Sequence, residues 1–181
     1  MEKIIVITGT SRGIGQALAR ELTGQTGHTV IGLSRNKEKL IALEHELKDQ
    51  PGSFTGIPAD LSDPSTSDNL AKILKEKYGR VDILINNAGA IVKKLFSRIE
   101  EHDIDHVMNV NFKAPFFLIQ KLLPLMGQDS HIVNITSMGG FQGSSKFPGL
   151  SLYSASKGAL ATLTEVLAEE LKQKKISVNA L

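Results

Sequence analysis

The chain of 181 residues is 41% hydrophobic and 22% charged, which is the composition of one soluble globular domain with a sizeable core. Its 21 basic and 19 acidic residues are scattered, and no basic stripe interleaved with aromatic residues marks a nucleic-acid partner. The absence of cysteine excludes disulfides, thiolate metal sites and a cysteine nucleophile, and it suits a cytoplasmic location. We expect a single domain over residues 1–181, with no apolar run long enough for a signal peptide or a membrane span.

Short β-branched runs alternate with longer amphipathic segments along the sequence. Strands are predicted at residues 3–8, 29–33, 54–57, 82–86 and 131–136, and a sixth starts at residue 176 and is left incomplete. Helical spacing follows Gly13 and recurs near residues 40–47, 70–74, 97–126 and 153–172. The runs IIVITG and HIVNIT are apolar nearly throughout, as strands buried on both faces of a parallel sheet require. Right-handed crossovers then predict a doubly wound α/β fold with three layers and about six strands.

The stretch VITGTSRGIGQAL joins the first predicted strand to the first predicted helix. Gly9, Gly13 and Gly15 permit a tight turn and let backbone amides approach a pyrophosphate at the amino end of the helix. A plain strand–helix turn is the alternative, but the position directly after the first strand favours a dinucleotide site. The first two glycines are separated by three residues, which differs from the common Gly-x-Gly-x-x-Gly turn.

The second predicted strand ends in IGLSRNKEKL, where proteins that bind NAD commonly carry an acidic residue for the ribose hydroxyls. Ser34 and Arg35 stand there instead. A carboxylate would repel a 2′-phosphate, whereas a guanidinium can bind it through two hydrogen bonds, and Arg12 can add a second positive charge. Two solvated arginines are the alternative interpretation. The sequence therefore favours NADP(H) over NAD(H) as the cofactor.

Polar residues interrupt the apolar segments of the second half. Asn111 lies in an apolar helical stretch shortly before Pro115, so we expect a kink with a freed carbonyl there. Ser137 follows the fifth strand, at the sheet edge where open α/β sheets bind ligands. Tyr153 and Lys157 lie one helical turn apart in LSLYSASKGAL. Taken singly, the serine is explained as a cap and the tyrosine as a packing residue.

In this order, TGTSRGIG, NNAG, Asn111, Ser137 and YSASK resemble the short-chain dehydrogenase/reductase family over the whole chain. The resemblance implies a Rossmann-like sheet, a nicotinamide cofactor and a catalytic group of Asn111, Ser137, Tyr153 and Lys157. It also implies a wider set of cofactor-binding residues, which are Gly9, Ser11, Arg12, Gly13, Ile14, Gly15, Ser34, Arg35, Asp60, Leu61, Asn87, Ala88, Gly89, Tyr153 and Lys157.

The pairing of a phenol with an ammonium group fits proton transfer. An unperturbed phenol has a pKa of about 10, and a cation within ~4–6 Å lowers such a pKa by about one to three units. Lys157 can therefore make Tyr153 a usable acid for ketone reduction, or a base for alcohol oxidation. By the resemblance, Ser137 holds the substrate oxygen and Asp60 lies near the adenine. We expect an NADP(H)-dependent oxidoreductase that reduces a small-molecule ketone or aldehyde to an alcohol, or the reverse.

The chain ends in KKISVNAL, before the Pro-Gly turn and the covering segment that family members commonly have. A truncated product, a proteolysed chain and a minimal version all fit this ending. The alternative function is accordingly a catalytically impaired module that binds or senses NADPH. A nucleotide-sugar epimerase fits less well, because its relatives use another glycine spacing. The resemblance also implies a homodimer or homotetramer formed through the helices at 97–126 and 153–172.

Two further features complete the sequence-based expectations. The segment after Ser137 is a few residues longer than usual, which suggests that Phe141 and Phe147 form part of the pocket wall. His102 and His106 have the spacing of metal ligands beside several carboxylates, but no fixed constellation surrounds them. We interpret these two histidines as an exposed helix face and predict no metal site.

Overall fold

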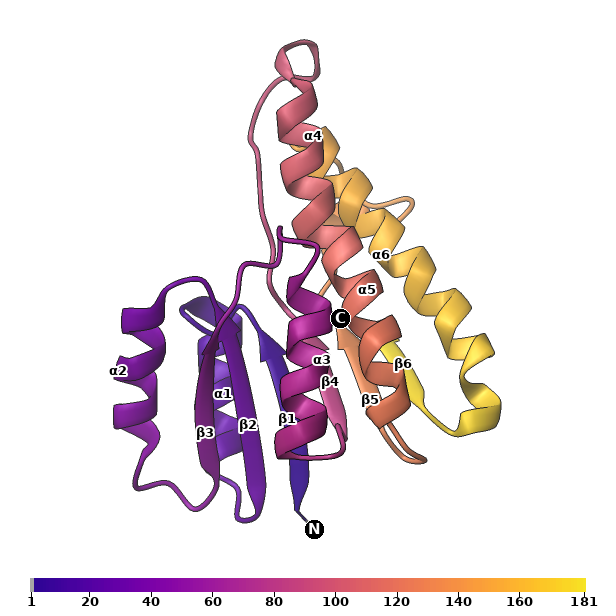
Figure 1. The fold of residues 1–181 in the computed structure, drawn as a ribbon. Coiled ribbons are helices and arrows are strands. Elements are labelled where there is room, and N and C mark those ends of the chain that lie inside the picture. The colour runs from indigo at the N-terminus through magenta and orange to yellow at the C-terminus, as the bar shows by residue number, and fades with distance from the viewer. Residues whose placement is uncertain (1) are drawn as a thin grey trace.

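The computed structural model describes residues 2–181 and contains one sheet of six parallel strands in the order β3-β2-β1-β4-β5-β6. The strands are β1 (Lys3–Thr8), β2 (His28–Ser34), β3 (Ser53–Pro58), β4 (Ile83–Asn86), β5 (His131–Asn134) and β6 (Ser177–Ala180). The α-helices are α1 (Gly13–Thr23), α2 (Lys37–Leu47), α3 (Thr66–Lys77), α4 (Glu101–Met108), α5 (Ala114–Leu122) and α6 (Ser151–Glu170). Figure 1 shows the helices packed around this sheet, which confirms the predicted doubly wound α/β fold.

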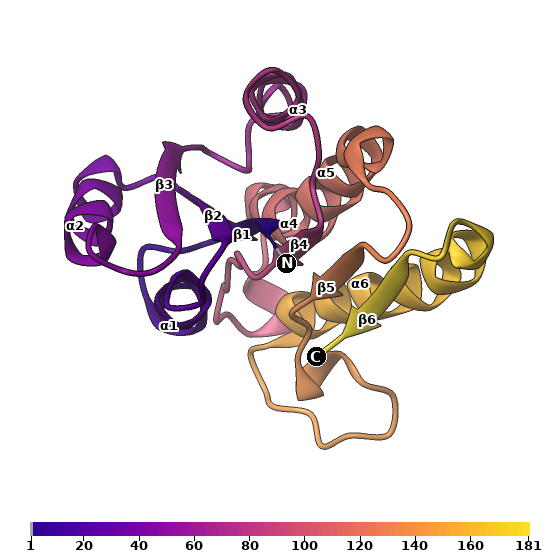
Figure 2. The same ribbon diagram turned by 90° about the horizontal axis from the view of Figure 1, so that it is seen from below.

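Two layers of helices cover the two faces of the sheet (Figure 2). Alternate residues of β1 point to opposite faces, and Ile5, Val6 and Ile7 have no exposed surface, as a central parallel strand requires. One apolar cluster joins the sheet to α1 and α2, and the other joins it to α3 and α5. Helix α6 packs on the same face of the sheet as α3 and α5. There the hydroxyl of Thr164 accepts a hydrogen bond from the side chain of Asn134 on β5.

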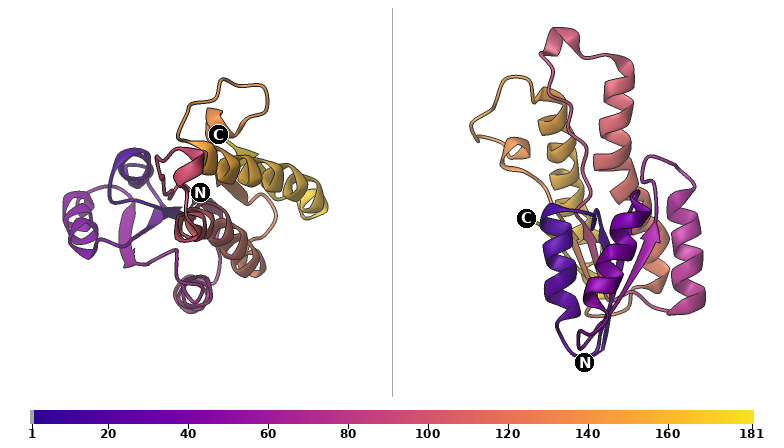
Figure 3. Two further views of the ribbon diagram at one scale, coloured as in Figure 1. Left: turned by 90° about the horizontal axis from the view of Figure 1, so that it is seen from above. Right: turned by 90° about the vertical axis from the view of Figure 1, so that its left-hand side faces the viewer.

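The strand order reverses at β1, which pairs with β2 on one side and with β4 on the other. Loops that leave the carboxyl ends of these strands therefore diverge to opposite faces, and such a switch point is where open α/β sheets form ligand crevices. Helices α4 and α6 extend beyond the sheet at this edge (Figure 1), and Figure 3 (left) looks onto the same edge from above. The crevice is thus a consequence of topology.

The predicted long helix at 97–126 is divided in the structure. A short 3-10 turn (Phe96–Arg98) precedes α4, and a π-helical turn, η2 (Asn109–Lys113), joins α4 to α5. The amide of Ala114 donates to the carbonyl of Asn109, five residues earlier. Pro115 has no N–H to offer the carbonyl of Asn111, four residues before it. The expected kink therefore takes the form of a π-turn, a feature that is frequent at functional sites.

None of the helices in the described part of the chain combines the length and the apolar character that a bilayer crossing requires.

Candidate active site

The glycine turn after β1 needs its glycines for different reasons. Gly9 and Gly13 have φ values of +77° and +61°, in the left-handed region that side chains avoid. A Cβ atom on Gly9 would also lie 2.9 Å from the Cα atom of Ala88. Gly15 has ordinary helical geometry, but a Cβ atom there would lie 2.4 Å from Nδ2 of Asn87. The turn therefore packs tightly against the loop that follows β4.

The amino end of α1 has the properties of an anion site. Arg12 occupies the N-cap position without a side-chain capping hydrogen bond, and the first turn contains no acidic residue. Nothing lies within 4 Å of where a Cβ atom of Gly13 would be, so the backbone is open to a ligand at this point. Free amide groups and the helix dipole favour a phosphate there. The turn thus fits a pyrophosphate group.

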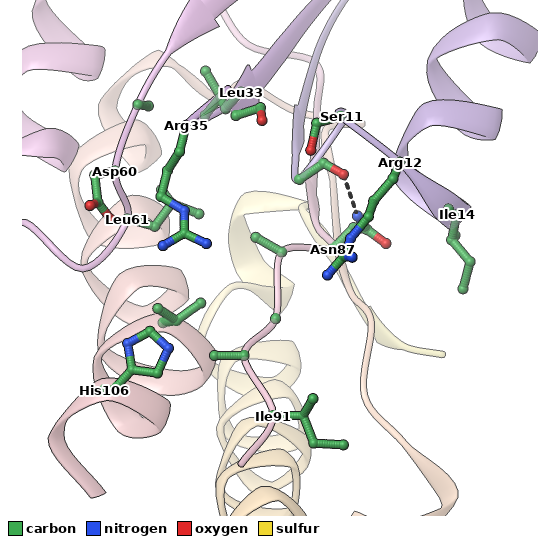
Figure 4. A pocket seen from close by; sticks show the side chains of 18 residues that line it. Ser11, Arg12, Ile14, Leu33, Arg35, Asp60, Leu61, Asn87, Ile91 and His106 are labelled. Atoms are coloured by element: carbon green, nitrogen blue, oxygen red, sulfur yellow. Dashed lines mark hydrogen bonds between the residues drawn. The ribbon is translucent and has the colours of Figure 1, made fainter. Parts of the chain in front are cut away.

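Asn87 connects the loop after β4 to the glycine turn. Its side-chain Nδ2 donates to the carbonyls of Thr8 and Gly9, at 2.9 and 3.3 Å. The hydroxyl of Thr8 in turn accepts from the backbone amides of Asn87 and Ala88, both at 2.9 Å. Figure 4 shows Asn87 beside the glycine turn, with its hydrogen bond dashed. These contacts hold the two loops in a fixed relative position.

A cavity of about 530 Å³ lies at the switch point between these loops. The predicted cofactor-binding residues that line it are Gly9, Ser11, Arg12, Gly13, Ile14, Ser34, Arg35, Asp60, Leu61, Asn87, Ala88 and Gly89. Arg12 and Arg35 enter it from different walls (Figure 4). Hydrogen bonds from Ser62 hold the pKa of the Asp60 carboxyl below its usual value, and the charges of Arg35 and His106 add to this effect. The cavity is therefore bordered by positive charge beside Asp60.

Asn111 is completely buried in the π-turn behind this cavity. Its Oδ1 accepts from the amide of Ala90 at 2.7 Å, and its Nδ2 donates to the carbonyl of Ala90 at 2.9 Å. A third bond runs from Nδ2 to the hydroxyl of Ser156 on α6, at 2.9 Å. The asparagine amide therefore joins the loop after β4, the π-turn and α6.

Lys157 is 3% exposed, and its Nζ donates to the carbonyl of Ile135 at 2.6 Å. Burial lowers the pKa of Lys157 to about 8, because the low-dielectric surroundings disfavour the charged form. The sequence predicted an ammonium group beside the hydroxyl of Tyr153. In the structure Tyr153 is half-buried one turn earlier on α6, and the Lys157 ammonium donates a hydrogen bond to the carbonyl of Ile135.

Gly89 links the cavity to these buried groups. It lines the cavity, and a Cβ atom built on it would lie 3.6 Å from Oδ1 of Asn111 and 3.7 Å from Nζ of Lys157. Ser137 is half-buried at the start of the 3-10 turn η4 (Met138–Gly140), and its hydroxyl accepts from the amide of Gly139 at 3.2 Å. That turn packs directly on α6, since a Cβ atom on Gly140 would lie 2.7 Å from the backbone of Lys157.

Some predicted residues lie outside the cavity lining, which does not include Gly15, Tyr153, Lys157, Asn111 or Ser137. The expectation that Phe141 and Phe147 form part of the pocket wall is wrong. These side chains are 67% and 64% exposed, and they do not line the cavity.

Several lining residues were not predicted, namely Leu33, Ala59, Ala90, Ile91, His106 and Val110. Leu33, Ala59 and Ala90 directly adjoin predicted cofactor-binding residues, and Ile91 follows Ala90. His106 and Val110 lie one turn apart on α4 and η2, and only their helical spacing ahead of Asn111 could have indicated that they line the cavity.

Comparison with known proteins agrees with this arrangement. The family model described as short chain dehydrogenase matches residues 3–181. The 3-oxoacyl-(acyl-carrier-protein) reductase FabG of Thermotoga maritima is 36% identical over 99% of this chain and 72% of its own length. A solved short-chain dehydrogenase from Streptomyces avermitilis superposes with a TM-score of 0.89 at 35% identity, and it covers 99% of this chain.

A third relative is a blue fluorescent protein from a metagenomic library, solved in complex with NADPH, with a TM-score of 0.91 and 32% identity over 98% of this chain and 72% of its own. The chain spans 64% of the Streptomyces protein, so it is shorter than each of these relatives. The match nevertheless runs through every strand of the sheet and through both loops that form the cavity. The chain therefore belongs to the short-chain dehydrogenase family.

Proposed function

We propose that the protein is an NADP(H)-dependent oxidoreductase that reduces a ketone or aldehyde to an alcohol, or catalyses the reverse reaction. The observation that carries this proposal is the position of Gly89, which borders the cavity and whose Cα faces Asn111 and Lys157, so that a Cβ atom built on it would lie within 4 Å of both side chains. A dinucleotide bound in the cavity would thus bring its far end to the buried polar groups. The Thermotoga relative is named a reductase of 3-oxoacyl groups, and this favours turnover over a module that only binds cofactor.

The residues around the cavity suit NADP(H) part by part. In this proposal the glycine turn and the first amides of α1 bind the pyrophosphate, and Arg12 and Arg35 bind the 2′-phosphate. Asp60 and Leu61 border the adenine, and Asn87, Ala88 and Gly89 border the ribose of the nicotinamide half. The positive charge of Arg35 and the lack of an acid at the end of β2 both support a phosphate on the ribose. The related protein solved with NADPH is consistent with this choice.

A nicotinamide cofactor, when bound in this cavity, would supply the hydride for the substrate carbon or accept it in the reverse reaction. We propose that the Tyr153 hydroxyl gives the proton to the substrate oxygen during reduction and that Ser137 hydrogen-bonds this oxygen. Lys157 contributes positive charge one turn from the phenol, and with a pKa of about 8 it is mostly protonated at neutral pH. Pro115 has no N–H for the backbone carbonyl of Asn111, four residues earlier. This backbone carbonyl is therefore available to hold a water molecule that supplies protons.

Oxidation of NADPH by a panel of 3-oxoacyl thioesters, dicarbonyls and quinones tests this function. We expect turnover with at least one class, and Tyr153→Phe should lower it about 100-fold or more while NADPH still binds. The matched control is Tyr78→Phe, since Tyr78 is the only other tyrosine and lies at the end of α3. Undiminished activity in Tyr153→Phe contradicts the acid role. Binding of NADPH without turnover on any substrate contradicts the enzyme proposal.

We further propose that the protein acts in the cytoplasm as a homodimer or homotetramer. The helices that the resemblance assigns to the interface carry exposed apolar side chains, with Ile104, Phe117 and Val166 exposed by 45%, 44% and 48%. Such side chains on neighbouring helices favour burial against a second copy. A molar mass from light scattering equal to that of one chain contradicts this assembly.

A further inference from the structure

His106 borders the cavity, although its spacing with His102 suggested a solvated helix face. It lies on α4, one turn before Val110, which also lines the cavity. In Figure 4 its ring stands below Leu61 and Arg35, on the side of the cavity that Asp60 occupies. Among the described residues that line the cavity it is the only one with an aromatic ring.

We infer that His106 is a further cofactor-binding residue, whose imidazole ring packs against the adenine of NADP(H). The inference rests on the proposed cofactor and deepens it. The pyrophosphate is expected at the amino end of α1 and the 2′-phosphate at Arg35, so the adenine must lie beyond Arg35, at the end that Asp60 and Leu61 form. A planar base is bound well by aliphatic side chains on one face and an aromatic ring on the other. Leu61, Val110 and His106 provide these surfaces.

The electrostatics of Asp60 place His106 at the same end of the cavity. Both Arg35 and His106 lower the pKa of the Asp60 carboxyl through their charge, so the imidazole lies within electrostatic range of this residue. His106 is exposed, and no hydrogen bond within the described chain fixes its ring. It is therefore free to adjust to a ligand.

His102 supplies a contrast on the same helix. Its ring nitrogens lie 3.2 Å from Oε2 of Glu100 and 3.4 Å from Oδ1 of Asp103, and it does not line the cavity. The two histidines therefore occupy different environments, and no group of metal-ligating residues is found in the part of the chain that the structure describes. His102→Ala is consequently a matched control for a change at His106.

Titration with NADPH and with 2′,5′-ADP, which lacks the nicotinamide half, tests the inference. We expect His106→Ala to weaken both ligands by the same factor, about fivefold or more, the lower range for a base stacked on an aromatic side chain. His106→Phe retains an aromatic ring, so its affinities for NADPH and for 2′,5′-ADP should stay within about twofold of the wild-type values. His106→Lys keeps only a positive charge and should not restore binding, and His102→Ala should leave both affinities unchanged.

The outcomes separate this inference from the proposed function. Wild-type affinity for 2′,5′-ADP in His106→Ala overturns the ring contact alone, as does recovery in His106→Lys without recovery in His106→Phe. A wild-type protein that binds neither NADPH nor 2′,5′-ADP overturns both the cofactor assignment and the contact. Thermal unfolding of each variant shows whether the fold is kept. Because His106 is exposed, we expect its substitution to change the stability of the fold little, so a loss of affinity reports on the ligand contact.

Discussion

The Nδ2 atom of Asn111 donates to the hydroxyl of Ser156 at 2.9 Å, and both side chains are completely buried. The same hydroxyl donates to the backbone carbonyl of Tyr153 at 2.8 Å. Ser156 thereby connects the π-turn to the segment of α6 that carries Tyr153 and Lys157. The relative positions of three proposed catalytic residues thus depend on Ser156, which does not line the cavity.

Ser156→Ala should therefore destabilise the protein. The substitution leaves one N–H of the buried Asn111 amide without a partner, and such a loss costs about 1–3 kcal/mol. Urea unfolding measures the change. Ser154→Ala is the control, because Ser154 is half-buried in the same motif and its hydroxyl forms no hydrogen bond within the described chain. It should change the free energy of unfolding by less than about 0.5 kcal/mol. An equal loss of unfolding free energy in the two variants would show that the Asn111–Ser156 hydrogen bond does not stabilise the protein.

Arg35→Asp should reverse the cofactor preference. Arg35 borders the cavity beyond the end of β2, and a carboxylate there repels a 2′-phosphate while it can accept hydrogen bonds from ribose hydroxyls. We expect the affinity for NADPH to fall about tenfold or more and the affinity for NADH to rise, since charge-assisted hydrogen bonds contribute about 1.5–3 kcal/mol each. Fluorescence titration with both cofactors measures the ratio.

Lys37→Asp controls for the change in net charge, because Lys37 is exposed at the start of α2 and lies outside the cavity. Its cofactor ratio should stay near that of the wild type. Discrimination that remains unchanged in Arg35→Asp, or that changes equally in both variants, contradicts the assignment of Arg35 to the phosphate.

Much of the fold could be predicted because local pattern and tertiary structure agree. The strand at Lys3–Thr8 was predicted with its observed bounds, since an apolar β-branched run followed directly by a glycine turn has few alternatives. Other strand ends shifted by one or two residues, as at β2 and β5, because hydrogen-bond partners in neighbouring strands decide where pairing stops. The site edge followed from the positions of the strands.

The remainder depended on contacts between distant segments. The π-turn that divides the long helix places Asn111 against Ala90, 21 positions earlier, and spacing alone does not reveal this pairing. The hydrogen bond from the Lys157 ammonium to the Ile135 carbonyl joins α6 to the segment after β5, and helical spacing alone does not reveal this contact. His106 is exposed, as predicted, but it also lines the cavity, and that position depends on where the segment with Asp60 and Leu61 lies across the crevice. None of these partners is close in the sequence.

Gly15→Ala should abolish cofactor binding and destabilise the fold. A Cβ atom at this position would lie 2.4 Å from Nδ2 of Asn87 and 2.5 Å from the carbonyl of Gly9, so the joined loops must separate. Overpacking of this kind costs about 1–3 kcal/mol. Gly79→Ala is the control, because Gly79 has φ +71° and open space around it, far from the cavity. It should cost about 1 kcal/mol through backbone strain and leave NADPH binding intact. Unimpaired binding in Gly15→Ala would contradict the role assigned to the turn.

The pKa of about 8 at Lys157 predicts how stability changes with pH. Because burial depresses this pKa in the folded state below the ordinary lysine value of 10.5, the unfolded chain binds more protons between pH 8 and pH 10.5. Stability rises with pH wherever the unfolded state binds more protons. The contribution of Lys157 is thus least favourable below pH 8, and it improves as the pH rises through the interval.

Urea unfolding of the wild type and of Lys157→Met, measured from pH 7 to pH 10, tests this. We expect the stability of the wild type relative to the variant to increase by about 2 kcal/mol over this range, since each unit of pKa shift corresponds to about 1.4 kcal/mol. The same comparison with Lys72→Met, an exposed lysine on α3, should give a difference that stays flat with pH. A flat difference for Lys157→Met as well would mean that the ammonium is not penalised by burial, and a decrease with pH would mean that the Ile135 carbonyl outweighs the loss of solvation.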